Sequence, residues 1–116
     1  MKGVLVGIFS FFLFASNDVY ADIGDHVSTA LKKVGKINIE SGQNGATYYF
    51  IAEDENWSAA NCPNAIYAYI WESDHGSKAI LSLALSAKAQ GQAIRFEGTC
   101  GSGTSDQYIK ITRIEI

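Results

Sequence analysis

The chain lacks the sequence motifs of the common enzyme classes. Its 116 residues contain two histidines and no GxSxG, HExxH or glycine-rich phosphate loop, so hydrolase, zinc-protease and nucleotide chemistry have no motif here. His75 follows Asp74, a pairing that acid–base catalysis can use, but a histidine in a polar turn before a helix is typically solvated. The acidic run 53–55 is consecutive, whereas a glycosidase places two carboxylates across a cleft. We therefore expect no enzymatic activity and no cofactor.

Positive charge is also in short supply. Lys and Arg number 9 against 12 Asp and Glu, and the formal net charge is −3. The group Lys32, Lys33 and Lys36 is most simply a solvated patch. Because binding to nucleic-acid phosphates requires clustered Lys and Arg, we expect no nucleic-acid partner.

Cysteine occurs only twice, as Cys62 and Cys100. No CxxC motif is present, and His26 and His75 lie at no recognised metal-ligand spacing from either cysteine, which argues against a redox pair or a metal site. A domain this small has a marginal core, and a cysteine pair normally closes in an oxidising compartment. We predict a structural disulfide, which in the chain-entropy model stabilises by about 4 kcal/mol.

The N-terminus carries an apolar run. In residues 1–21, MKGVLVGIFSFFLFASNDVYA, one lysine precedes the run, and Val19 and Ala21 have the spacing that a signal peptidase recognises. The run falls short of the roughly 20 apolar residues of a membrane-spanning helix, so we expect no membrane insertion. Residues 1–21 are predicted to be a cleaved signal peptide and residues 22–116 a single secreted or periplasmic domain. An uncleaved anchor is the alternative.

The rest of the chain reads mainly as strands. Alternation places Ile37 and Ile39 on one face of the first strand, and Asn44-Gly45 is a hairpin turn signal. In the last strand the isoleucines change faces, which predicts a bulge or a strong coil of the strand near Thr112. The predicted strands are VGKINIE (34–40), TYYFIA (47–52), AIYAYIW (65–71), QAIRFEG (92–98) and YIKITRIEI (108–116). DHVSTALKKVG (25–35) is expected to add a helical turn before them.

One helix is predicted between the third and fourth strands, over residues 78–90. Ser77 is a favourable N-cap residue, and Gly91 stands where a left-handed C-terminal cap belongs. The apolar stripe is broad and contains Ile80, Leu81, Leu83, Ala84, Leu85 and Ala87. Packing on the core of a monomer and helix-to-helix contacts between protomers both explain such a stripe.

The order strand, strand, strand, helix, strand, strand is that of the OB-fold, a five-stranded barrel that binds oligonucleotides and oligosaccharides. We therefore predict a mainly β, OB-fold-like barrel with one helix between strands three and four. The helix would cover one end of the barrel.

Several short motifs resemble the B subunits of the pertussis and subtilase group of bacterial A-B toxins. In that group a "YFCI"-like strand precedes a helix that ends in a "tGq" turn and a "VRI"-like strand; here TYYFIA, SKAILSLALSAKAQGQ and AIRFEGTC correspond. The chain is also similar to small secreted proteobacterial proteins of unknown role. The resemblance covers roughly residues 46–100. The chain departs from the toxin subunits at Phe50, where they often have a cysteine, and it is shorter at its end.

The resemblance implies a homo-oligomeric ring that binds cell-surface glycans and carries an enzymatic A subunit, with the helices lining the pore. Two alternatives stand beside it. One is a periplasmic OB-fold protein that binds another small ligand, and the other is a small secreted inhibitor or interaction protein.

The loop after the second strand carries the candidate ligand site. Asp54, Asn56 and Trp57 place an aromatic ring beside hydrogen-bonding groups, a chemistry suited to the apolar face and the hydroxyls of a sugar. The alternative is that Trp57 covers the edge of the barrel. We predict carbohydrate binding by these three residues.

Overall fold

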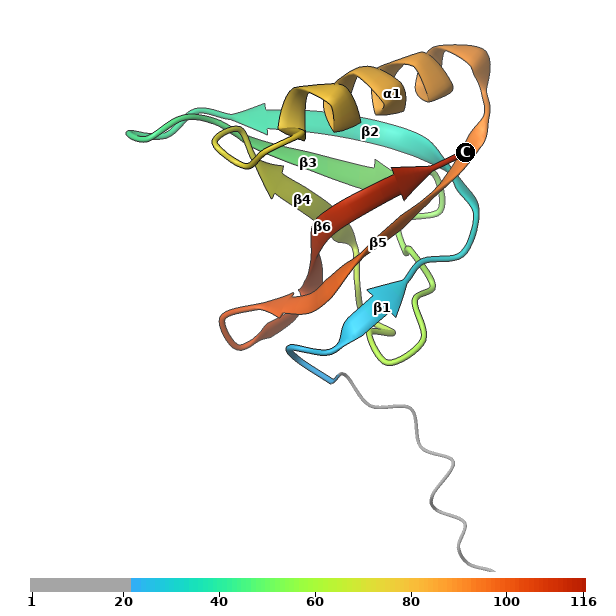
Figure 1. Ribbon diagram of the computed structural model, residues 1–116. Helices are drawn as coiled ribbons and strands as arrows, with labels where there is room; N and C mark the ends of the chain where they lie inside the picture. Colours follow the sequence, from blue (N-terminus) through green and yellow to red (C-terminus); the bar gives the residue numbers. More distant parts are fainter. Residues whose placement is uncertain (1–21) are drawn as a thin grey trace, which may run out of the picture.

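A computed structural model describes residues 22–116 of the chain, and the predicted signal peptide lies outside the described residues (Figure 1). The described part is mainly β with one helix, as predicted. Its elements are β1 (His26–Ser28), β2 (Lys32–Glu40), β3 (Thr47–Ala52), β4 (Tyr67–Trp71), α1 (Ser77–Gln90), β5 (Ala93–Ser102) and β6 (Ser105–Glu115). No helix within residues 22–116 is long and apolar enough to cross a membrane.

Five of the strands close into a ring. The pairing order runs β5, β2, β3, β4, β6, and β6 pairs again with β5. Neighbours in the ring are antiparallel except β4 and β6, which are parallel. With α1 between the third and fourth strands of the ring, this arrangement agrees with the OB-fold-like architecture expected from the sequence.

The segment before the ring is a strand, which corrects the prediction of a helical turn over residues 25–35. β1 pairs with β5, and Val27 lies opposite Gly98. Just beyond β1, the Oγ1 atom of Thr29 accepts a hydrogen bond from the backbone N–H of Phe96 at 3.0 Å. Strand pairing outweighs the local preference for a helix, because it satisfies backbone hydrogen-bonding groups along β5 that would otherwise lack partners.

The core lies inside the ring, where alternate residues of each strand meet. Phe50 and Phe96 are fully buried, with ring centroids 5.3 Å apart. On β2, Ile37 packs partly against this core but Ile39 is 59% exposed, because the β2–β3 hairpin continues beyond the core (Figure 1). The alternation on β2 therefore overstated the length of the buried face.

The predicted bulge near Thr112 is confirmed. Glu97 pairs with Arg113 and the next residue, Gly98, pairs with Ile111, so Thr112 has no opposite residue. A Cβ atom at position 98 would lie 1.9 Å from the carbonyl oxygen of Lys110. Glycine is needed here because the two strands approach too closely for any side chain.

Helix α1 packs against β2, β5 and β6 (Figure 1). Gly91 ends it in the left-handed conformation, as predicted, but Ser77 is not its N-cap. The cap is Gly76, and the Ser77 hydroxyl instead donates to the carbonyl of Glu72 at 2.7 Å. Residues 22–116 cover the apolar stripe only partly, because Leu85 is 50% exposed.

Cys62 and Cys100 form the predicted disulfide, with their Cα atoms 5.7 Å apart. The bond attaches the long loop between β3 and β4 to β5. Both cysteines are buried, so the link is part of the core.

Candidate functional site

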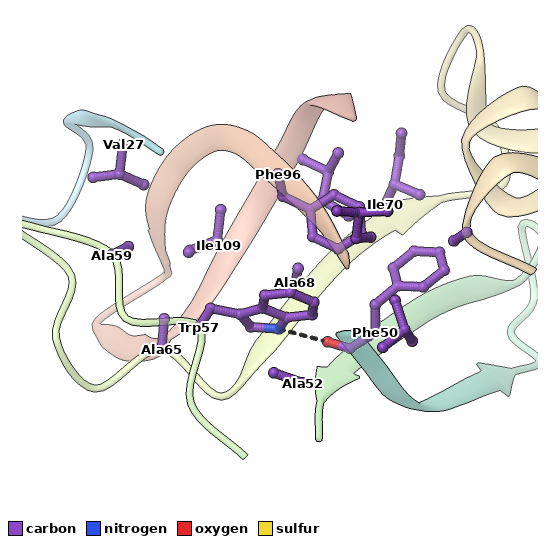
Figure 2. Close-up of a cluster of buried hydrophobic side chains, with 14 of the residues drawn as sticks. Val27, Phe50, Ala52, Trp57, Ala59, Ala65, Ala68, Ile70, Phe96 and Ile109 are labelled. Carbon is purple, nitrogen blue, oxygen red and sulfur yellow. Dashed lines mark hydrogen bonds between the residues drawn. The ribbon is translucent and has the colours of Figure 1, made fainter. Parts of the chain in front are cut away.

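The loop predicted to bind a ligand places Trp57 in the core. Its side chain is fully buried, and its indole N–H donates to the backbone carbonyl of Phe50 at 3.0 Å (Figure 2). Phe96 packs edge-on against the indole, with the centroids 5.0 Å apart. A ring that has no exposed face cannot stack on a sugar. The role predicted for Trp57 is thereby corrected, and the residue is structural.

Asp54 and Asn56 do not converge on a site with Trp57 either. Asp54 is exposed and pairs with Lys32; this hydrogen bond lowers the pKa of the Asp54 carboxyl below its usual value. The Asn56 side chain donates to the carbonyl of Pro63 at 3.0 Å and accepts from the backbone N–H of Ser58 at 2.6 Å. These contacts hold the loop in shape.

The outer surface of the ring instead gathers aromatic side chains from three strands, which we call the tyrosine face. Each strand sends alternate residues outward, while its intervening residues, such as Phe50, Ala68 and Ile109, are buried. The tyrosine face consists of Tyr49 on β3, Tyr67, Tyr69 and Trp71 on β4, and Tyr108 on β6. Tyr69 lies at its base and is covered by its neighbours, with only 7% of the residue exposed.

Strand register brings these residues together. Tyr49 lies opposite Tyr69 in the antiparallel β3–β4 pair, and Tyr67 lies opposite Tyr108 in the parallel β4–β6 pair. Side chains directly opposite on one face are neighbours. Residues far apart in the sequence thus become adjacent.

The rings contact one another across the face. Tyr67 and Tyr108 are stacked with centroids 5.0 Å apart, and Tyr69 meets Tyr108 edge-on at 5.9 Å. Tyr49 lies edge-on to Tyr67 at 6.2 Å, and Trp71 extends the cluster by an edge contact with Tyr69 at 6.0 Å. These distances are typical of favourable aromatic pairs, so the rings hold one another in place.

Trp71 is the most accessible ring of the face, at 48% exposed. The ammonium nitrogen of Lys110 lies over it, 4.3 Å from the ring centroid, and also contacts the Asp74 carboxylate at 3.0 Å. The indole therefore carries a cation over its ring and is still about half exposed.

Polar groups border the rings. The hydroxyl of Tyr49 donates to the Glu40 carboxylate at 3.2 Å. Burial, together with this hydrogen bond, raises the pKa of Tyr49 above its ordinary value. Tyr49 is thus neutral and a donor near neutral pH.

The tyrosine face contains two shallow hollows. The Trp71 hollow, of about 210 Å³, is lined by Tyr49, Tyr69, Trp71, Ser102 and Tyr108. The Glu40 hollow, of about 240 Å³, is lined by Asn38, Glu40, Tyr49, Tyr67 and Tyr108. Tyr49 and Tyr108 belong to both, so the hollows are adjacent and together form an aromatic surface with a polar border.

The sequence contained one signal for this surface. The third predicted strand alternates Tyr67, Tyr69 and Trp71 with aliphatic residues, and a strand that is apolar on both faces presents one of them outward unless something covers it. The contributions of Tyr49 and Tyr108 could not be read in this way, because they depend on strand pairing. Within residues 22–116, no group of three or more His, Cys, Asp or Glu side chains is placed to hold a metal ion.

Comparison with known proteins adds no relative: no family model, no curated protein and no solved structure matches this chain.

Proposed function

We propose that the protein is a secreted, non-enzymatic binding protein whose tyrosine face binds carbohydrate. The observation that carries the proposal is the set of aromatic rings on the outer surface of β3, β4 and β6, with Trp71 about half exposed among them. A pyranose ring offers an apolar face that stacks on such rings, while its hydroxyls pair with bordering groups such as Asn38, Glu40 and Ser102. This replaces the Trp57 loop as the proposed carbohydrate site.

The position of the tyrosine face fits the ligands of this fold class, and charge favours a sugar over a nucleic acid. OB-folds bind oligonucleotides and oligosaccharides on the surface of their second and third strands, which correspond here to β3 and β4. A single-stranded nucleic acid would also stack on aromatic rings but needs a positive groove beside them. Here Lys110 is paired with Asp74, and the net charge of the chain is −3.

The proposed secretion is supported by the disulfide. Bonds such as Cys62–Cys100 form and persist in oxidising compartments, which fits an extracytoplasmic location. The ring assembly and the enzymatic A subunit implied by the resemblance to toxin B subunits stay predictions, as do the alternatives of another small ligand or a protein partner. The solution mass of the purified protein tests the ring directly.

A glycan array followed by titration of each hit tests the carbohydrate proposal. Trp71→Ala should weaken binding of a hit about tenfold, in line with the loss of one aromatic contact. Leu85→Ala is the matched control, because Leu85 is equally exposed, at 50%, but lies on α1. An array without hits, or equal affinities for the parent and Trp71→Ala, would refute the proposal.

A further inference from the structure

The Glu40 hollow combines aromatic rings with a carboxylate. Tyr49, Tyr67 and Tyr108 line it together with Asn38 and Glu40, and all three rings are partly buried and so held in position. Glu40 makes no ion pair with any residue in the described range 22–116; its contact there is the Tyr49 hydroxyl. The hollow therefore carries a negative charge without a matching cation.

Such a lining selects for an organic cation. The face of an aromatic ring is negative, so several rings around one point attract an ammonium group, and quaternary ammonium groups are the ligands that aromatic cages typically bind. A small inorganic cation is favoured less, because it would have to exchange its water for rings rather than for oxygen ligands. A methylated ammonium is weakly hydrated and also gains from contact with apolar surface.

The neighbouring part of the tyrosine face already binds an ammonium group from the protein itself. The Lys110 nitrogen lies 4.3 Å from the Trp71 ring centroid and is neutralised by Asp74. The Glu40 hollow repeats this combination of rings and a carboxylate. Among the described residues it has no lysine or arginine of its own in its lining.

We propose that the Glu40 hollow is a binding site for a quaternary or methylated ammonium group, with Glu40 as its counter-ion and with Tyr49 and the stacked pair Tyr67 and Tyr108 as its aromatic wall. The volume of about 240 Å³ suits a group of the size of choline's head. This site goes beyond carbohydrate binding. It would allow the protein to recognise ligands that carry a choline-type group, either free or attached to a larger molecule.

Titration of the purified protein with choline chloride, followed by calorimetry and by NMR of the tyrosine ring protons, tests the site. The reference ligand is the neutral isostere of choline, in which a tert-butyl group replaces the trimethylammonium group. We expect choline to bind about fivefold or more tightly than the isostere, the scale of cation–π attraction at a partly exposed site. If choline and its neutral isostere bound with equal affinity, the hollow would recognise only apolar groups, and the proposal would be overturned.

Two variants locate the site. Tyr67→Leu keeps apolar bulk but removes a ring, and it should weaken choline binding about fivefold. Glu40→Gln removes the exposed counter-ion while keeping the shape, and it should weaken choline binding by about two- to fivefold. Glu115→Gln is the charge-matched control, because Glu115 lies on β6 outside the hollow and should leave binding unchanged. Choline affinity that is unaffected by Glu40→Gln and by Tyr67→Leu, in variants with wild-type circular dichroism, would overturn the assignment.

The experiment separates this site from carbohydrate binding. Choline binding together with an array that has no hits would refute only the carbohydrate proposal. Glycan binding without choline binding would refute only the ammonium site.

Discussion

Exchange of the buried tryptophan is the sharpest test of the structural interpretation. Trp57 is fully buried, and its N–H donates to the Phe50 carbonyl at 3.0 Å. In Trp57→Phe the lost hydrogen bond should cost about 1 kcal/mol, and the space left by the smaller ring roughly 1–2 kcal/mol more. We therefore expect the free energy of unfolding to fall by about 2–3 kcal/mol, a loss that a domain of ordinary stability survives.

The matched comparison is Trp71→Phe. Trp71 is 48% exposed, so the same exchange there should change stability by about 0.5 kcal/mol or less. Urea unfolding followed by far-ultraviolet circular dichroism measures both values. Each variant retains a single tryptophan, so acrylamide should quench Trp71 strongly and Trp57 weakly. Equal stability losses for the two variants, or strong quenching of Trp57, would refute the core assignment and return Trp57 to the surface.

Three further predictions concern the disulfide, the helix and acid stability. Joint replacement of Cys62 and Cys100 by Ala should lower the free energy of unfolding by about 4 kcal/mol, since the bond closes a loop with a sequence separation of 38; an unchanged urea midpoint would contradict it. Leu85→Asp should be tolerated because Leu85 is half exposed, whereas Leu81→Asp should lower the thermal midpoint strongly because Leu81 packs against the core. The hydrogen bond with Lys32 lowers the pKa of Asp54, so this pKa is lower in the folded than in the unfolded protein. The stability that the Asp54 carboxylate contributes is therefore fully present above the unfolded pKa and is lost as the pH falls through the folded pKa. Thermal midpoints measured from neutral pH into this acid range should therefore fall less steeply in Asp54→Asn, and identical slopes would contradict the ion pair.

The features that could be predicted from the sequence depend on short-range patterns. The Asn44-Gly45 turn signal placed the hairpin strand 47–52 at its observed bounds, and the end of the helix followed from Gly91 in the left-handed conformation. The change of face among the isoleucines of β6 predicted the bulge at Thr112. Side chains in a strand alternate between its two faces, so one inserted residue moves all later apolar residues to the other face, and this change can be read in the sequence. The disulfide followed from the presence of only two cysteines.

Tertiary structure decided everything that depends on which strands are neighbours. In the sequence, a tryptophan in a polar loop is typical of a ligand contact. In the fold, the loop returns to the core, and the indole N–H of Trp57 donates to the Phe50 carbonyl there. Residues 26–28 form a strand only because β5 offers an edge to pair with. Tyr49, Tyr67 and Tyr108 form one surface only because antiparallel and parallel pairing place three strands side by side, and side chains opposite one another on neighbouring strands are unrelated in sequence.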